Sequence, residues 1–235
     1  MKLKILSFNW HEPYLCLLAR TGHEFLIVEP EIVHGHYRHW DQNIRSIPEN
    51  VSLISKNTAR EMLEQGEFDL VIANNIKDLI DVRDYILPKI LVFHNCLSTE
   101  ISLTKNKVNR KNYFRNIKPL LKDVDKVFIS EKKRQDWGLN GEVILPGLDI
   151  YEYGGYRGDK ETVLQVGNQL QERDLMMGYT TSKKILGNHP LITIGDNPNI
   201  HNSRLSDGFQ DLLENYRSCR VFINTTVDEY EDGYN

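Results

Sequence analysis

Side chains suited to binding an anion lie in two polar loops in the last third of the chain. The apolar run 163–167 leads into a loop that carries Arg173, and the run 191–194 leads into Gly-Asp-Asn-Pro at 195–198. Arg173 stands near a predicted helix start, where an anion gains from a guanidinium and from unpaired backbone N–H groups. Ligands of parallel sheets bind outside the carboxyl ends of the strands, so these loops are the first place to expect chemistry.

A second candidate is His94, near the end of the apolar run 88–95. A histidine at the carboxyl end of a parallel strand can donate a hydrogen bond to a hydroxyl or support a developing charge. It can equally be a structural histidine at a strand end. The histidines at 34, 36 and 39 and the acidic run 228–232 have spacings that would allow a cation. No cysteine or Glu-x-x-His pattern accompanies the histidines, so solvated loops are the favoured interpretation and no metal site is predicted.

The run 105–122 contains basic residues and no acidic one, and its apolar residues recur at helical spacing. A basic amphipathic helix of this kind could lie on an anionic membrane or attract an anionic acceptor. The alternative is a helix that packs its apolar face on the sheet and turns its basic face to water. We favour this alternative because the core needs the same apolar residues.

The elements that must position these residues follow from continuous apolar runs separated by helical segments. Such runs predict an α/β fold with parallel strands that are covered on both faces. Strands are predicted at 3–8, 25–28, 51–55, 68–75, 88–95, 126–129, 142–145, 163–166, 191–194 and 221–226. Helices are predicted at 14–19, 58–65, 81–85, 105–122 and 207–216, with Asn57 and Ser130 as N-caps. The glycine-rich run 153–159 predicts a boundary between a first domain, 1–153, and a second, 160–235.

Composition narrows the class of protein. The chain has 235 residues, 29 of them basic and 33 acidic, which is enough for one large or two small domains. The mildly acidic balance argues against nucleic-acid binding. No run approaches the roughly 20 apolar residues of a membrane helix, and the N-terminus lacks a signal-peptide pattern, so a cytoplasmic location is predicted. Cys16, Cys96 and Cys219 lie far apart, which predicts free thiols.

The order of these motifs resembles that of the GT-B glycosyltransferases, in particular the large retaining family of sugar-nucleotide transferases. That family often reads Val-Gly-Arg-x-x-x-x-Lys-Gly and later Gly-Asp-Gly-Pro. Here Gly167 matches, Asn168 replaces the arginine, Arg173 takes the place of the lysine, and 195–198 matches the second block. His94 matches a histidine that ends a proline-led strand. Residues 232–235 match the family's Glu-Gly-Phe-Gly, with aspartate first.

The resemblance implies two Rossmann-like domains, the second one incomplete, and transfer of a sugar from a nucleotide-sugar donor. It implies retention of configuration without a metal or cofactor, because cationic groups and helix N-termini can neutralise the leaving diphosphate. The implied catalytic residues are His94 and Asp232. The implied donor-binding residues are Gly167, Asn168, Arg173, Asp196, Thr225, Gly233 and Tyr234. The acceptor, whether glycan, lipid or small molecule, is left open, as is peripheral contact with the inner face of an anionic membrane.

Two other functions stay open at this point. A sugar-nucleotide epimerase could use the same fold and would need no acceptor. A non-catalytic nucleotide-sugar-binding protein would fit the asparagine at 168 and the incomplete final motif. In the resembled family, the glutamate that Asp232 matches opens a Glu-x7-Glu motif, and the second glutamate of that motif does not appear before Asn235. The sequence therefore predicts a fragment of a longer protein. Alone, such a fragment should expose a face or edge of its second sheet, bind nucleotide weakly and transfer no sugar.

Overall fold

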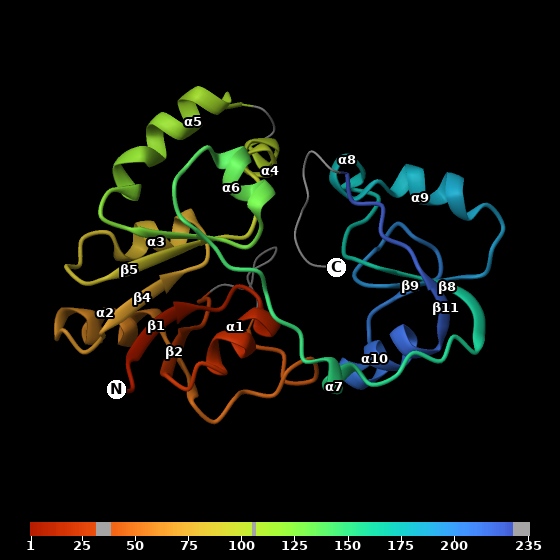
Figure 1. The fold of residues 1–235 in the computed structure, drawn as a ribbon, viewed down its shortest axis with the longest axis horizontal. Coiled ribbons are helices and arrows are strands. Elements are labelled where there is room, and N and C mark those ends of the chain that lie inside the picture. The colour runs from red at the N-terminus through yellow and green to blue at the C-terminus, as the bar shows by residue number, and fades with distance from the viewer. Residues whose placement is uncertain (32–38, 105–106, 228–235) are drawn as a thin grey trace. The chain divides into compact units, whose positions relative to one another are not determined.

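The computed structural model describes residues 1–31, 39–104 and 107–227, which form two compact units (Figure 1). Unit 1 spans residues 1–147 and unit 2 spans residues 148–235. Unit 1 ends a few residues before the glycine-rich run 153–159, where the domain boundary was predicted. Both units are built on parallel sheets with helices, so the predicted α/β class is confirmed.

Unit 1 is organised by a sheet of seven parallel strands in the order β3-β2-β1-β4-β5-β6-β7. Its strands are β1 (Lys4–Phe8), β2 (Glu24–Val28), β3 (Val51–Ile54), β4 (Leu70–Ala73), β5 (Lys89–Phe93), β6 (Asp125–Phe128) and β7 (Glu142–Val143). The strand order reverses between β1 and β4. In sheets of this kind, ligands bind at the carboxyl ends of the strands beside such a reversal.

Side chains cap the starts of four of the described helices of unit 1, which are α2, α3, α5 and α6. They are α1 (Glu12–Ala19), α2 (Lys56–Glu64), α3 (Ile76–Val82), α4 (Leu97–Leu103), α5 (Arg110–Ile117), the 3-10 turn η1 (Lys118–Leu121) and α6 (Glu131–Trp137). Ser130 caps α6 as predicted, by accepting a hydrogen bond from the Lys133 amide. The prediction for Asn57 is wrong, because Ser55 accepts from the Thr58 amide and α2 starts before residue 57.

The helix predicted at 81–85 is placed too late in the chain. It begins at Ile76, because the Asn75 side chain accepts hydrogen bonds from the amides of Lys77 and Asp78. These bonds satisfy donors that every helix start leaves unpaired, and they allow the helix to follow β4 almost at once. Asn75 was predicted as the polar end of a strand, and its capping role was not predicted.

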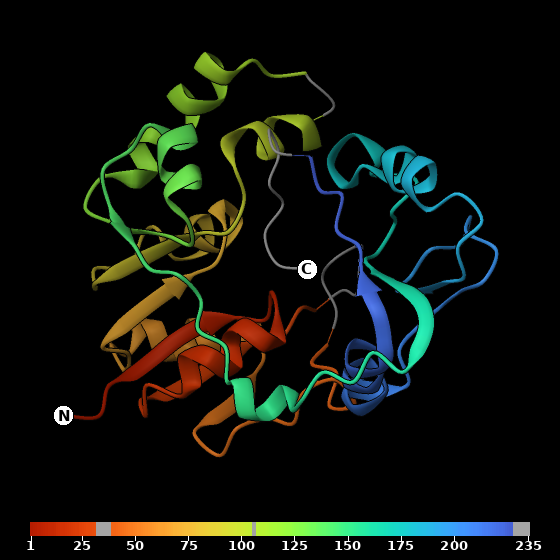
Figure 2. The same ribbon diagram turned by 45° about the vertical axis from the view of Figure 1, so that its right-hand side comes forward.

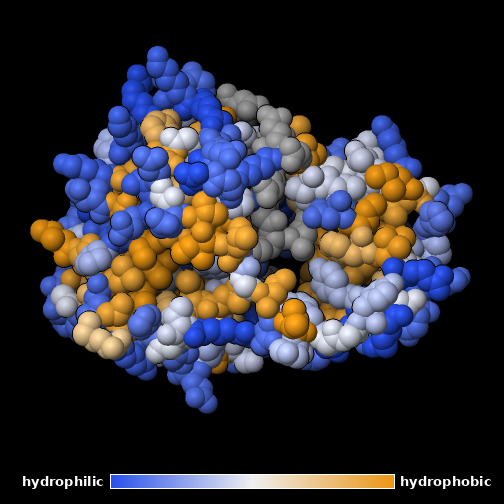
Figure 3. Space-filling model, in the orientation of Figure 1, coloured by the Kyte–Doolittle hydropathy of each residue, from blue (hydrophilic) through white to orange (hydrophobic). Residues whose placement is uncertain are grey.

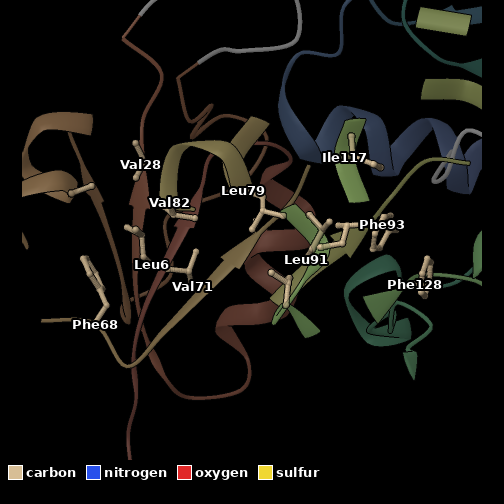
Figure 4. Packing of buried hydrophobic residues seen from close by; sticks show 14 of the residues in the cluster. Leu6, Val28, Phe68, Val71, Leu79, Val82, Leu91, Phe93, Ile117 and Phe128 are labelled. Carbon is tan, nitrogen blue, oxygen red and sulfur yellow. The ribbon is translucent and has the colours of Figure 1, made fainter. Parts of the chain in front are cut away.

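The core of unit 1 lies on both faces of the sheet. Along β1, Leu6 packs into one buried cluster and Ile5 into another, as the alternation of side chains along a strand requires. The cluster around Leu6 is closed by residues of α2, α3 and α5, including Leu79 and Ile117 (Figure 4). The cluster around Ile5 is closed by α1 through Leu15. Coverage of both faces explains why the strands read as continuous apolar runs.

The basic run forms a shorter helix than predicted, since α5 covers 110–117 and residues 105 and 106 lie outside the described residues. Ile117 and Leu121 are buried in the core, and Tyr113 packs against it. The outward face is hydrophilic, as the upper left of Figure 3 shows over α5. Arg110 on this helix pairs with Asp136 at 2.8 Å. The apolar residues therefore serve the core, which supports the favoured interpretation of this run. Among the described residues, no helix has the length and hydropathy needed to cross a bilayer.

Unit 2 has a sheet of four parallel strands in the order β10-β9-β8-β11. The strands are β8 (Lys160–Val166), β9 (Leu191–Ile194), β10 (Ser203–Arg204) and β11 (Cys219–Phe222). The helices are α7 (Ile150–Tyr153), α8 (Asp174–Met177), α9 (Tyr179–Leu186) and α10 (Gly208–Ser218). Figures 1 and 2 show α9 and α10 on opposite faces of this sheet. Along β8, Leu164 packs toward α10, and the next residue, Gln165, donates a hydrogen bond to Ser182 of α9.

The strand predicted at 221–226 begins two residues earlier, at Cys219, and ends at Phe222. Among the described residues it pairs with β8 alone, and Val221 and Phe222 on it are 51% and 39% exposed. All three cysteines are free thiols, as predicted, with Cys96 and Cys219 buried.

Candidate functional site

Hydrogen bonds fasten the loop after β8 of unit 2 to the loop after β9. Asn168 accepts through Oδ1 from the Asp196 amide at 2.8 Å. Asn197 accepts through Oδ1 from the Leu170 amide at 2.8 Å and donates through Nδ2 to the Gly167 carbonyl, also at 2.8 Å. Each loop thus supplies one asparagine that holds the other loop's backbone. We call this pair of loops the asparagine clasp.

Two glycines permit this close approach. Gly195 has a φ of +138°, and a Cβ there would overlap the carbonyl oxygen of Gly167. A Cβ on Gly167 would lie 2.7 Å from Cδ2 of Leu170, which is tighter than side chains tolerate. The loops therefore meet through backbone, and the asparagines bond across the gap. Gly167 matters here for close packing, in addition to its predicted place beside a donor.

The clasp explains why asparagine stands at 168, where the resembled family has arginine. Its Oδ1 is used to hold the Asp196 amide, so Nδ2 is the group through which Asn168 could contact a ligand. Asn197, which stands where the family has glycine, was not predicted as a site residue. The two departures occur together and their side chains complete one clasp. That pairing is the sequence signal that could have identified Asn197.

Arg173 lies where the clasp leads into α8. Its amide donates to the Gln169 carbonyl at 2.9 Å, and its own carbonyl accepts from the amides of Met176 and Met177 at 2.8 Å. The side chain is half-buried, and this burial lowers the pKa of the guanidinium below its ordinary value. An arginine stays charged under such a shift. A cation partly withdrawn from water attracts an anion more strongly than an exposed one.

The N-terminus of α9 is capped by a carboxylate of the protein itself. Asp174 accepts from the Thr180 amide at 2.7 Å and from the Thr180 hydroxyl at 2.5 Å. These bonds lower the pKa of Asp174. Asp174 also occupies the positive end of the helix, where an anionic ligand would otherwise gain. Of the two anion-binding features predicted for this loop, Arg173 is therefore the one that could hold a ligand.

Thr225 lies in the loop after β11 and joins that loop to α8. Its hydroxyl donates to the Met177 carbonyl at 2.9 Å, and the Val227 amide donates to the Met176 carbonyl at 2.7 Å. A chain of bonds thus brings Gly167, Asn168, Arg173, Asp196 and Thr225 to the carboxyl edge of one sheet. The remaining predicted residues of this site, Asp232, Gly233 and Tyr234, lie outside the described residues.

His94 lies in unit 1, just after β5, beside the strand reversal at β1 and β4. It is 8% exposed, its Nε2 is 3.2 Å from Oδ1 of Asn74, and its ring meets that of Tyr14 edge-on at 4.6 Å. Burial lowers the pKa of His94 to about 3, and the nearby charges of His11 and Lys133 act in the same direction. His94 is therefore neutral near pH 7. A neutral ring suits the predicted hydrogen-bonding role better than the predicted support of a developing charge, and both roles stay predictions.

A small cavity of about 20 Å³ opens beside His94. Trp10, Asn75, Asn95, Glu100 and Trp137 also line it. Glu100 accepts from Nδ2 of Asn95 at 2.8 Å, and burial raises the pKa of its carboxyl. A cavity of this volume holds one water-sized group, such as a single hydroxyl.

Within the part of the chain that the structure describes, no three His, Cys, Asp or Glu side chains cluster as metal ligands do. His39 lies 2.8 Å from Glu29 through Nδ1. His34, His36 and the acidic run 228–232 fall outside the described residues.

The fold is shared with solved glycosyltransferases of the GT-B class. HepE of Anabaena, in complex with UDP and glucose, superposes with a TM-score of 0.64 at 15% sequence identity, over 95% of this chain and 74% of HepE. Its complex with UDP-glucose gives a TM-score of 0.57 at 16% identity, over 96% and 70% of the two chains. Sucrose-phosphate synthase of Thermosynechococcus elongatus gives 0.51 at 12% identity, over 97% and 71%.

At these sequence identities the superpositions establish the fold alone. The predicted GT-B fold with its Rossmann-like units is confirmed. No protein-family profile matches the sequence, and no curated protein matches it.

Proposed function

We propose that this protein is a glycosyltransferase that binds a nucleotide-sugar donor at the asparagine clasp of unit 2. The observation that carries the proposal is the placement of Arg173 directly after the clasp, at the carboxyl edge of a parallel sheet in a GT-B fold. Among proteins with this fold, HepE has been crystallised with UDP and with UDP-glucose. A half-buried guanidinium beside a rigid backbone loop suits a diphosphate group.

In the proposed reaction, the bond between the sugar and the diphosphate breaks and negative charge grows on the leaving phosphate. Arg173 stabilises that charge because its position is fixed before the reaction begins. Such preorganised electrostatic stabilisation is usually the largest contribution of a site to the rate. The chemistry needs no metal or cofactor on this account. Retention of configuration, with Asp232 and the amides of Gly233 and Tyr234 beside the sugar, is part of the proposal because the sequence resemblance implies it.

His94 in unit 1 is proposed to hydrogen-bond an uncharged hydroxyl of a substrate. Its neutrality favours this role, since an uncharged imidazole offers one donor and one acceptor to uncharged groups. The acceptor of the sugar is a glycan, a lipid or a small molecule. We place the protein in the cytoplasm, where contact of the basic face of α5 with an anionic membrane would bring it close to a lipid acceptor.

A binding protein without catalysis is the second candidate, and two observations favour it. Asn168 uses its Oδ1 to hold the neighbouring loop, and Asp174 occupies the N-terminus of α9. Both features reduce the positive potential available to a diphosphate. A nucleotide sugar that binds without being consumed in the presence of any acceptor would support this candidate. A sugar-nucleotide epimerase would instead convert the donor with no acceptor present.

A thermal-shift screen of nucleoside diphosphates and nucleotide sugars, followed by product analysis, tests the proposal. A ligand at 100 times its Kd stabilises the folded protein by about 2.7 kcal/mol through mass action. We expect one nucleotide series to raise the melting temperature of this chain. Its nucleotide sugar should be consumed by the longer protein that the sequence predicts, and only when an acceptor is supplied. If no nucleotide or nucleotide sugar shifts the melting temperature, the proposed function is wrong.

A further inference from the structure

A chain of buried hydrogen bonds joins β1, β4 and β5 of unit 1 at their carboxyl ends. Ser7 and Asn74 are almost wholly buried, at 0% and 2% exposed. Asn74 donates through Nδ2 to the Ser7 hydroxyl at 3.1 Å and to the Phe8 carbonyl at 3.3 Å. Its Oδ1 lies 3.2 Å from Nε2 of His94. Asn74 therefore sits between β1 and the histidine.

The direction of each bond in this chain is determined by chemistry. The Ser7 hydroxyl donates its one hydrogen to the Ile72 carbonyl at 2.8 Å, so towards Asn74 it can only accept. The Phe8 carbonyl can also only accept. The amide nitrogen of Asn74 must therefore face Ser7 and Phe8, and its oxygen must face His94. An amide oxygen carries no hydrogen, so the hydrogen between Asn74 and His94 belongs to Nε2.

We propose that Asn74 is a positioning residue that, with Ser7, locks His94 in the tautomer with hydrogen on Nε2 and a bare Nδ1. A neutral imidazole carries one ring hydrogen, so Nδ1 is a hydrogen-bond acceptor. Its ligand is then a hydroxyl or another uncharged donor. Phosphate and carboxylate oxygens, which bring no hydrogen, are disfavoured at this nitrogen. This assignment rests on the proposed function only in naming a substrate hydroxyl as the partner.

The surroundings of the ring keep it in this state. Tyr14 of α1 meets the ring edge-on, and the charges of His11, next to α1, and of Lys133 on α6 act on the ring. Both charges oppose protonation of His94. Asp78 of α3 accepts a hydrogen bond from the backbone N–H of Asn74 at 3.0 Å, and so holds the backbone of the positioning residue. The lock thus combines a fixed amide orientation with surroundings that exclude the imidazolium.

Nitrogen NMR of the histidine rings in the whole chain tests the lock without any ligand. The chain has eight histidines, and His94→Gln identifies the signals of His94. We expect the wild type to show the Nε2–H tautomer alone, with no titration between about pH 5 and pH 8. Asn74→Ala should give a mixture of tautomers. Asn74→Asp, which keeps the size of the side chain, should raise the pKa of His94 by about one unit or more, because a carboxylate then faces the ring.

The matched control is Asn50→Ala, which removes a half-buried side-chain amide elsewhere in unit 1. Its Nδ2 donates to the carbonyls of Ala19 and His23, and it should leave the His94 signals unchanged. A wild-type ring with hydrogen on Nδ1 would overturn the proposal. So would a tautomer and pKa of His94 that are the same in both Asn74 variants as in the wild type. A lock confirmed in a protein that binds no nucleotide would leave this inference standing while the proposed function falls.

Discussion

Replacing Asp78 by asparagine should make unit 1 more stable at pH 8 and leave it almost unchanged at pH 4. Asp78 lies in the first turn of α3 and is 6% exposed. Burial raises the pKa of its carboxyl to about 7 from an ordinary value of 3.8, and the nearby Asp81 acts in the same direction. The Asn74 amide, which donates to Asp78, opposes this shift only in part.

The sign follows from comparing the two states. Between pH 3.8 and about 7, the unfolded chain has released the proton of Asp78 while the folded chain still holds it. The free energy of unfolding therefore falls as the pH rises, by about 1.4 kcal/mol per pH unit and about 4 kcal/mol in all. Asparagine cannot ionise, yet its oxygen can still accept from the Asn74 amide. Asp78→Asn should thus exceed the wild type by about 2–4 kcal/mol at pH 8.

Urea unfolding followed by tryptophan fluorescence measures this difference. All three tryptophans, Trp10, Trp40 and Trp137, lie in unit 1, so the signal reports on that unit. Asp78→Asn and the wild type must be compared at the same pH, because other groups also change the stability of unit 1 with pH. The low pKa of His94 works in the opposite direction, since it removes stability as the pH falls below 6.5.

Asp84→Asn, which changes an exposed carboxylate just after α3, is the control and should change stability little at any pH. Equal stability of Asp78→Asn and the wild type at pH 8 would show that Asp78 ionises as an ordinary carboxylate. The argument from its burial would then be wrong.

Three further predictions concern the site and its surroundings. In the longer protein that the sequence predicts, His94→Ala should lower turnover more than it weakens nucleotide binding; equal rates of variant and wild type would leave His94 a structural residue. Asn197→Ala should destabilise unit 2 by about 2–3 kcal/mol and speed amide hydrogen exchange in the clasp, because it removes the acceptor of the Leu170 amide and a donor to Gly167. If α5 contacts membrane, the protein should bind anionic vesicles better than neutral ones, and less as salt increases. Equal partition into both kinds of vesicle would leave α5 only its packing role.

The strands were predictable because parallel strands buried on both faces need continuous apolar runs, and β1, β2, β4 and β5 have them. The starts of α2 and α3 were harder to predict. Polar residues compete for the capping position there, and which of them caps is decided by side-chain geometry that spacing does not contain. For that reason Ser55 and Asn75 are the N-caps, and both helices start earlier than predicted.

The site was predictable as a place but not as a mechanism. The glycine at 167 and the block at 195–198 indicated the loops, whereas the clasp joins residues 27 to 30 positions apart. Which side chain bonds which amide depends on the register of β8 against β9, which the sequence does not state. The neutrality of His94 likewise comes from burial and from neighbours on α1 and α6, so it could not be seen in the motif.

Calorimetric titration with UDP, GDP and ADP tests the central claim, that the asparagine clasp with Arg173 binds a nucleoside diphosphate. We predict that at least one of them binds, and that Arg173→Ala weakens it by about 1.5–3 kcal/mol, or roughly 10- to 150-fold in Kd. The matched control is Arg220→Ala on β11, whose side chain pairs with Glu161 at 2.7 Å; it should bind as the wild type does. Binding that is unchanged in Arg173→Ala, or absent for all three nucleotides, would contradict the claim.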